Sequence, residues 1–176
     1  MRTQIWQGGS SDRQVQQRLF TNYGERLYRV AYRYLNDQMA AEDATSEAFV
    51  KIFRTVDDQE FAHRNLFEAW MRRIVINQAL ERLRRQKRWQ QERELPVETS
   101  RDGEDDVLAM LSLQEVLHLV QALPEGYRTI LQLYVFDGFT HADIAKALGI
   151  SLGTSKSQLN KARAYLKRQL KKANSI

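Results

Sequence analysis

The stretch FTHADIAKALGISLGTSKSQLNKARAYL, residues 139–166, decides the fold of the C-terminal half of this chain. It predicts a short helix over 141–148, because the Thr140 hydroxyl can accept a hydrogen bond from a free backbone amide at the helix start. Gly149 can adopt the positive φ of a tight turn, and Ser151 precedes a second helix. Two helices joined in this way are typical of a helix-turn-helix, in which the second helix enters the major groove of duplex DNA.

The side chains of this stretch divide into a buried set and an exposed set. We expect the helices to pack through apolar and small residues: Ile144, Ala145, Leu148, Ile150, Leu159, Ala162 and Leu166. The outward face of the second helix is polar and basic, with Lys156, Asn160 and Arg163 in one stripe and Gln158 further round. Gln and Asn can pair with adenine, while Lys and Arg can reach guanine or phosphate. This chemistry favours a DNA-reading helix over the alternative, an ordinary helical hairpin.

Helical spacing continues through most of the chain, which contains two prolines and eight glycines. Alternating strand patterns are missing, so the predicted fold class is all-α. One helix is expected to end at Asn36-Asp37. A second should follow, and its expected buried side is Ala41, Ala44, Ala48, Phe49, Ile52 and Phe53. After a polar connection over 55–64, a long helix should begin near Asn65 and run into the basic residues that follow. Its expected apolar stripe is Leu66, Phe67, Trp70, Ile74 and Leu80.

The same spacing divides the chain into two small helical domains. Residues 1–10 are expected to be a flexible tail, 11–93 a first domain and 109–176 a second domain that holds the helix-turn-helix. Between them, residues 94–108 lose helical spacing and combine a proline, a glycine and a run of acidic residues. That composition predicts a flexible acidic linker.

A further helix is expected within the second domain, just before the helix-turn-helix. Pro124 suits the first turn of this helix, and Asp137-Gly138 should end it. Its expected apolar face is Tyr127, Ile130, Leu131 and Tyr134.

Basic residues gather in two blocks rather than spreading evenly. The chain has 27 Lys and Arg against 22 Asp and Glu, a formal net charge of +5. Residues 81–93 contain six Lys or Arg and 161–172 contain six more, while 98–106 between them are acidic. Two basic blocks with an acidic spacer favour two DNA-facing surfaces on separate domains.

Composition excludes or disfavours several classes of function. The chain has no cysteine, which excludes disulfides and thiolate zinc sites, and its three histidines are scattered. No nucleophile–base motif, phosphate-binding loop or metallohydrolase spacing is present. We therefore expect no enzyme activity, no metal and no cofactor. No apolar run approaches the roughly 18 residues of a membrane span, and the N-terminus lacks the apolar core of a signal peptide, so the expected location is the cytoplasm.

Two further clusters are candidate binding surfaces. An acidic cluster contains Glu42, Asp43 and Glu47, with the last two one helical turn apart. Three interpretations stay open for it: a metal site, a partner surface and a solvated face. A metal is the least favoured, because no further ligand completes a shell. In the long basic helix, one face is either a solvated surface or a DNA contact, and it carries Asn77, Glu81, Arg84 and Arg88.

In their order along the chain, these segments resemble the extracytoplasmic-function (ECF) sigma factors, the smallest members of the bacterial sigma-70 family. AEDATSEAFVKIF, residues 41–53, is similar to the family's polymerase-clamp helix. FEAWMRRIVINQAL at 67–80, with LRRQKR at 83–88, is similar to its −10 recognition helix. LPEGYR at 123–128 resembles the opening of the C-terminal domain, and GTSKSQLNKAR at 153–163 resembles the −35 reader.

The resemblance implies a protein that binds core RNA polymerase and directs transcription initiation at specific promoters. Its implied partners are core RNA polymerase, promoter DNA and an anti-sigma factor. It implies that Asp43 and Glu47 bind the polymerase. The implied −10 contacts are Asn77, Arg84, Arg85 and Arg88, and the implied −35 contacts are Ser151, Thr154, Lys156, Gln158, Asn160 and Arg163.

Two residues depart from the family's pattern. Ser155 stands where the family usually has Val, and Gln158 where it often has Arg. We expect a weaker core under the second helix from the first, and a changed base preference from the second. The main alternative is a stand-alone helix-turn-helix regulator that binds operators as a dimer. It would leave residues 19–88 without a role, and no heptad seam for dimerisation is present.

Overall fold

Residues 12–85 and 118–173 are described in the computed structural model of this chain. The chain divides into two units between residues 86 and 87, and each unit is described by itself. Every regular element in the described residues is helical, which confirms the predicted all-α class. The tail predicted at 1–10 and the linker predicted at 94–108 lie outside these residues.

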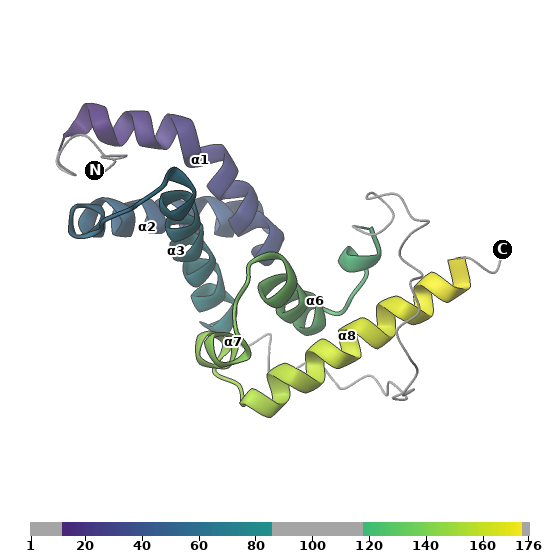
Figure 1. Ribbon diagram of the computed structural model, residues 1–176. Helices are drawn as coiled ribbons and strands as arrows, with labels where there is room; N and C mark the ends of the chain where they lie inside the picture. Colours follow the sequence, from purple (N-terminus) through teal and green to yellow (C-terminus); the bar gives the residue numbers. More distant parts are fainter. Residues whose placement is uncertain (1–11, 86–117, 174–176) are drawn as a thin grey trace. The chain divides into compact units, whose positions relative to one another are not determined.

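The first unit is built from α1 (Arg13–Leu35), α2 (Gln38–Thr55) and α3 (Arg64–Arg85), with a 3-10 turn, η1 (Val56–Asp58), after α2. Each of these three α-helices packs against the other two (Figure 1). The segment between η1 and α3 falls within the polar connection that the sequence predicts.

The break between α1 and α2 follows from two adjacent polar residues. Asn36 has a φ of 49°, in the left-handed region that Asn tolerates better than most residues. Asp37 then caps α2, because its side chain accepts a hydrogen bond from the Ala40 amide at 2.8 Å. The predicted break at Asn36-Asp37 is therefore confirmed.

Small residues let α2 lie close to its neighbours. Ala41, Ala44 and Ala48 are fully buried, as the predicted buried side of this helix requires.

On α3, the prediction of the apolar stripe fails at Leu66, which is 53% exposed. The buried side of the first turns of α3 passes through Phe67 and its neighbours one and two turns later, so Leu66 falls on the opposite side of the helix.

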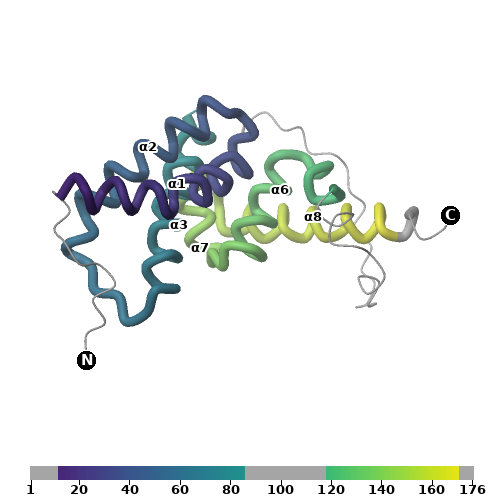
Figure 2. The backbone as a smooth tube through the Cα atoms, turned by 90° about the horizontal axis from the view of Figure 1, so that it is seen from above, coloured from purple at the N-terminus to yellow at the C-terminus, as the bar shows by residue number. Residues whose placement is uncertain are grey.

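The second unit contains a helical stretch at 118–121, α6 (Glu125–Leu131), α7 (His141–Leu148) and α8 (Leu152–Ala173). Both α6 and α7 pack against α8 (Figure 2). Pro124 is the N-cap residue of α6, with a φ of −50°. The sequence analysis placed Pro124 in the first turn of this helix. In the structure it lies one position earlier.

One π-helical turn, η3 (Gln132–Phe136), follows α6. The π turn is defined by a hydrogen bond between residues five positions apart: the Asp137 amide donates to the Gln132 carbonyl at 3.1 Å. The prediction that Tyr134 belongs to the apolar face is wrong, since Tyr134 is 38% exposed. The π turn changes the helical phase and rotates this position away from the buried face of α6. The chain leaves η3 at Asp137, and Gly138 has a φ of 68°.

Thr140 and Asp143 cap α7 reciprocally. The Thr140 hydroxyl accepts from the Asp143 amide at 3.1 Å, and Asp143 Oδ2 accepts from the Thr140 amide at 3.2 Å. This capping box pairs two amides that the helix itself leaves without partners. The predicted start of the first motif helix is therefore confirmed.

Replacing Thr140 with alanine is expected to destabilise the second unit by about 1 kcal/mol, because the cap on α7 is lost. Urea unfolding of the full chain, followed by helical circular dichroism, measures this change. Ser157→Ala is the matched control, since Ser157 is exposed and its hydroxyl donates to a carbonyl inside α8. Superimposable unfolding curves for Thr140→Ala and the unmodified chain would contradict the role of the cap.

Candidate nucleic-acid and partner interfaces

The turn between α7 and α8 joins the two helices of the predicted motif. Gly149 has a φ of 69°, and its amide donates to the Ala145 carbonyl, which confirms the left-handed turn. Ile150 is half-buried next to it. At the start of α8, Ser151 Oγ accepts from the Thr154 amide at 3.0 Å, and the two hydroxyl oxygens lie 2.9 Å apart. Two predicted DNA contacts, Ser151 and Thr154, thus also form the cap of the second helix.

The outward face of α8 has the character that the sequence predicts. Its exposed residues include Lys156, Asn160 and Arg163. On the inward side, Leu159 and Ala162 are buried, as predicted, and Leu166 is half-buried. The Arg163 guanidinium lies over the Tyr134 ring, 5.9 Å from its centroid. The exposed tyrosine of η3 therefore extends the polar face of α8.

Gln158 lies at the edge of this face in a half-buried position. Its carbonyl oxygen, Oε1, is buried and has no hydrogen-bond partner. An unpaired buried carbonyl costs about 1–3 kcal/mol. A side-chain position that brings this oxygen to a donor would therefore be favourable.

Ser155 is fully buried. The sequence analysis expected it to weaken the core under α8, but in the structure its hydroxyl has a hydrogen-bond partner. Its hydroxyl oxygen lies 2.9 Å from His141 Nδ1. The His141 ring stacks on Tyr134, with centroids 4.6 Å apart. Burial lowers the pKa of His141, and the charges of Lys156 and Arg163 lower it further. The sequence analysis missed His141, because its contact with Ser155 exists only once α7 packs on α8.

On α3, the predicted DNA contacts lie on the exposed side. Asn77 is exposed, and so are Arg84 and Arg85. Both arginines bind Glu81: Arg84 Nη2 lies 2.5 Å from Oε2, and Arg85 Nε lies 3.2 Å from Oε1. Burial raises the pKa of Glu81, but hydrogen bonds and charges from the two arginines outweigh it and leave that pKa lowered. Arg88, the fourth predicted contact, lies outside the described residues.

The acidic cluster on α2 faces a cation on α3 that the sequence analysis did not predict. Arg82 Nη1 donates to Asp43 Oδ2 at 3.3 Å, and Nη2 donates to Glu47 Oε1 at 2.7 Å. The Arg82 side chain is 24% exposed, whereas those of Asp43 and Glu47 are 68% and 53% exposed. The carboxylates are therefore fixed in position by Arg82 and still present most of their surface to solvent.

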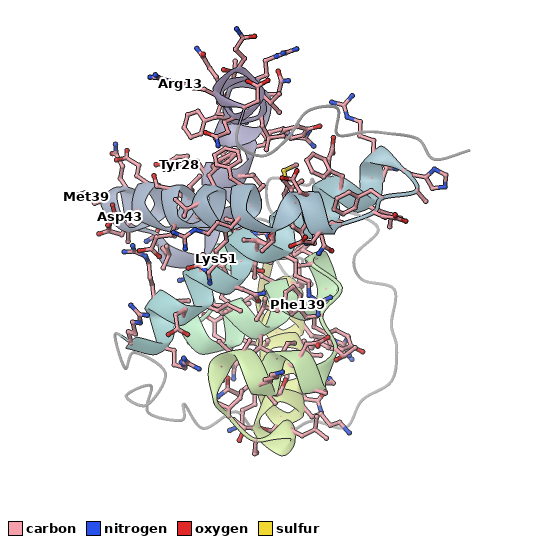
Figure 3. The ribbon with its side chains drawn as sticks, turned by 90° about the vertical axis from the view of Figure 1, so that its left-hand side faces the viewer. Arg13, Tyr28, Met39, Asp43, Lys51 and Phe139 are labelled. Atoms are coloured by element: carbon pink, nitrogen blue, oxygen red, sulfur yellow. The ribbon has the colours of Figure 1, made fainter. Side chains whose placement is uncertain are left out.

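Polar and apolar neighbours surround these carboxylates. Gln78 of α3 is buried, and in the amide orientation that satisfies both of its groups it donates to Glu47 Oε2 at 3.3 Å and accepts from Lys51 Nζ at 2.5 Å. Figure 3 shows Asp43 beside Met39 near the start of α2, with Lys51 further along the helix. Met39 is strongly exposed. Exposed methionine is enriched at protein interfaces, so Met39 makes this side of α2 a candidate partner surface.

Aromatic side chains gather where the polar connection meets α3. The Phe61 ring lies 5.2 Å from that of Phe67 and 5.3 Å from that of Trp70. Phe67 is buried, as predicted, whereas Phe61 and Trp70 are half-buried. Beside them, Arg64 Nε donates to Tyr23 Oη at 3.2 Å. Partly exposed aromatic rings next to a cation are suited to stacking with an unpaired base.

Within residues 12–85 and 118–173, no cluster of three His, Cys, Asp or Glu residues could hold a metal ion. The carboxylates of Asp43 and Glu47 are paired with Arg82 instead. None of the helices in this part of the chain is long and apolar enough to cross a membrane.

Comparison with known proteins gives consistent matches over both units. A family model described as Sigma-70 region 2 matches residues 19–89, and one described as Sigma-70, region 4 matches residues 113–166. The ECF RNA polymerase sigma factor SigM of Mycobacterium tuberculosis is 30% identical over 161 residues, which cover 92% of this chain and 80% of that protein. SigE of Mycolicibacterium smegmatis, another ECF RNA polymerase sigma factor, is 30% identical over 89% of this chain, which spans 62% of its length. SigW of Bacillus subtilis is 27% identical, with 85% of each chain covered.

Proposed function

The chain belongs to the sigma-70 family, as an extracytoplasmic-function sigma factor that directs promoter recognition, and on that premise we propose which surface binds which partner. Helix α8 reads the −35 element, α3 and the aromatic cluster before it open and read the −10 element, and α2 binds core RNA polymerase. The chain acts by binding, without catalysis, in the cytoplasm where the polymerase transcribes. An anti-sigma factor is a further partner that the family resemblance implies.

The observation that carries the −35 assignment is the polar face of α8 within a capped helix-turn-helix. Residues near the N-terminus of the second helix of such a motif contact base edges in the major groove. Lys156 and Asn160 are exposed in the first turns of α8, and Gln158 lies beside them. Arg163, two turns after Lys156, reaches phosphate. Ser151 and Thr154 complete the set at the helix start, where their hydroxyls can also donate to phosphate.

The −10 assignment rests on the exposed side of α3 and on the aromatic cluster. Opening a duplex costs a few kcal/mol in lost stacking, and stacking on an aromatic side chain returns about 1–3 kcal/mol per base. Phe61 and Trp70 offer partly exposed rings for this purpose. Asn77 supplies an amide for hydrogen bonds to a base. Arg84 and Arg85, and Arg88 beyond the described residues, neutralise phosphates.

Polymerase strengthens promoter binding, because each DNA reader alone is small and binds DNA weakly. When α2 holds the chain on core RNA polymerase through Asp43 and Glu47, the second DNA contact becomes effectively intramolecular. Two weak contacts then add to a stable and specific promoter complex.

The experiment that tests the proposed function is transcription with purified core RNA polymerase from a DNA library with randomised upstream sequences. With the chain present, transcripts should begin downstream of one shared pair of −35 and −10 sequences, and core polymerase alone should give no such pattern. A chain that selects a palindromic operator but adds no promoter-specific transcription would be the stand-alone regulator instead.

In the same assay, Lys156→Ala and Gln158→Ala are each expected to relax the −35 preference at one base pair, by roughly 1 kcal/mol. For Gln158, binding would bring the unpaired Oε1 to a donor in the groove. Arg163→Ala is the contrasting control, because loss of a phosphate contact should weaken all sequences alike and reduce the salt slope by about one unit. Identical −35 preferences in Lys156→Ala, Gln158→Ala and the unmodified chain would remove both side chains from base reading.

A further inference from the structure

A titratable ring lies inside the helix-turn-helix. His141 is the first residue of α7, and its Nδ1 atom lies 2.9 Å from the hydroxyl oxygen of Ser155 in α8. Ser155 is fully buried, so its hydroxyl depends on a protein partner rather than on water. The bond therefore ties the first helix of the motif to the second.

Two cations of the reading helix act on this ring. Lys156 and Arg163 of α8 both act on the charge of His141, and the ring of Tyr134, stacked on His141 at 4.6 Å, also lies under the Arg163 guanidinium at 5.9 Å. The nearest acidic group on its own helix, Asp143, is engaged with Thr140 in the capping box. In the free chain, burial and two neighbouring positive charges therefore lower the pKa of His141 and disfavour its charged form.

The hydroxyl of Ser155 can bind His141 in either protonation state. A neutral ring can accept the hydroxyl proton at Nδ1 or donate Nδ1–H to the oxygen, and a charged ring donates Nδ1–H. Proton uptake therefore does not require the contact between α7 and α8 to break. A valine or alanine at position 155 would leave Nδ1 of His141 without that hydrogen-bond partner.

From this geometry we propose that His141 is a positioning residue for α8, held through Ser155, and that it takes up a proton when α8 binds DNA. The proposal rests on the proposed −35 reading by α8. A phosphate bound by Arg163 and base acceptors bound by Lys156 reduce the repulsion that opposes a charge on the ring. DNA binding is then linked to proton uptake at a site beside the reading face.

The direction of the effect follows from linkage. The pKa of His141 is lowered in the free chain and should rise in the complex, because the DNA brings negative charge near the ring. Between these two values the complex holds up to one proton more than its separated components. Affinity for DNA therefore increases as the pH falls through the pKa of the complex, and levels off below the pKa of the free chain.

The test uses the full chain at constant low salt, because DNA affinity depends steeply on ionic strength. The probe is a fluorescein-labelled duplex that carries the −35 sequence recovered from the transcription library. Binding is measured by anisotropy between pH 5 and pH 8, and the His141 ring is titrated by NMR with and without the duplex. We expect a pKa increase for His141 on binding, and a gain in affinity of up to about tenfold per unit of that increase.

Variants separate the proton from the hydrogen bond. His141→Asn places an amide where Nδ1 lies, so it should bind like the unmodified chain at pH 8 and lose the gain at low pH. His141→Phe retains a ring for stacking on Tyr134 but loses the bond to Ser155, so it should bind several-fold more weakly at every pH. In a Ser155→Ala background, that further loss should vanish, because the two residues act as a pair. His118→Gln, at an exposed histidine of the same unit, is the control and should keep the full pH dependence.

Three results would overturn the proposal: an unchanged pKa of His141 on DNA binding, the same pH dependence in His141→Asn as in the unmodified chain, or additive losses for His141→Phe and Ser155→Ala. Each of them leaves the −35 assignment intact if the unmodified chain binds its selected duplex. A chain that binds no duplex at any pH would overturn both.

Discussion

Exchange of Asp43 and Glu47 for lysine is expected to weaken the binding of the full chain to core RNA polymerase by roughly a hundredfold, because two fixed carboxylates are lost and two repulsive charges replace them. Both carboxylates are held by Arg82 and yet largely exposed, which is the arrangement that a docking surface needs. Binding of labelled chain to immobilised core polymerase measures the effect. Circular dichroism on the same samples shows whether the helices persist.

The intramolecular pairing makes Arg82→Gln the decisive companion variant. If the carboxylates act only by joining α2 to α3, Arg82→Gln should weaken polymerase binding as much as the double exchange does. If they bind the polymerase, Arg82→Gln retains them and should bind far better than the double exchange. Glu42→Lys is the matched charge control, since Glu42 is exposed on the same helix and accepts from Gln38 rather than from Arg82. Equal losses in all three variants would remove Asp43 and Glu47 from the interface.

Asn77→Ala is expected to reduce promoter opening by between roughly 5-fold and 150-fold, which corresponds to the loss of about 1–3 kcal/mol of base contact. Asn77 is exposed on the side of α3 opposite its buried stripe, so its replacement should leave the fold unchanged. Permanganate reactivity of unpaired thymines in the polymerase complex measures opening. A gel shift at low temperature measures the closed complex, which should form nearly as well as with the unmodified chain.

The control for this variant is Asn22→Ala, at an exposed asparagine of α1 in the same unit. It should leave both closed and open complexes unchanged. Full opening by Asn77→Ala would show that Asn77 is an idle surface residue, and a loss of helical signal would show that its role is structural.

Local signals in the sequence predicted the local structure well. The helix break at Asn36-Asp37, the cap at Thr140 and the turn at Gly149 are each decided by a few adjacent residues, and each was found where predicted. The alternation of buried and exposed residues along α8 follows equally from helical periodicity, since Leu159 and Ala162 are buried and Asn160 is exposed.

Contacts between helices were less accessible to prediction. The salt bridges of Arg82 join residues 39 and 35 positions apart, and periodicity cannot pair side chains over that distance. The exposure of Tyr134 depends on a π turn, and a single inserted residue in a helix leaves no clear mark in the apolar spacing. Ser155 looked like a defect in the core because its partner, His141, lies on another helix.

The bridge that Arg82 makes from α3 to α2 also limits how this protein can be recombined with its relatives. A chimera that keeps α2 but takes α3 from another sigma factor would replace Arg82 and leave the two carboxylates without their cation. The reverse chimera would replace Asp43 and Glu47 and leave a half-buried guanidinium without its anions. Functional exchanges should therefore move residues 12–85 as a block. By the same reasoning, natural variation at position 82 should be accompanied by variation at 43 or 47, a pattern that an alignment of close relatives would reveal.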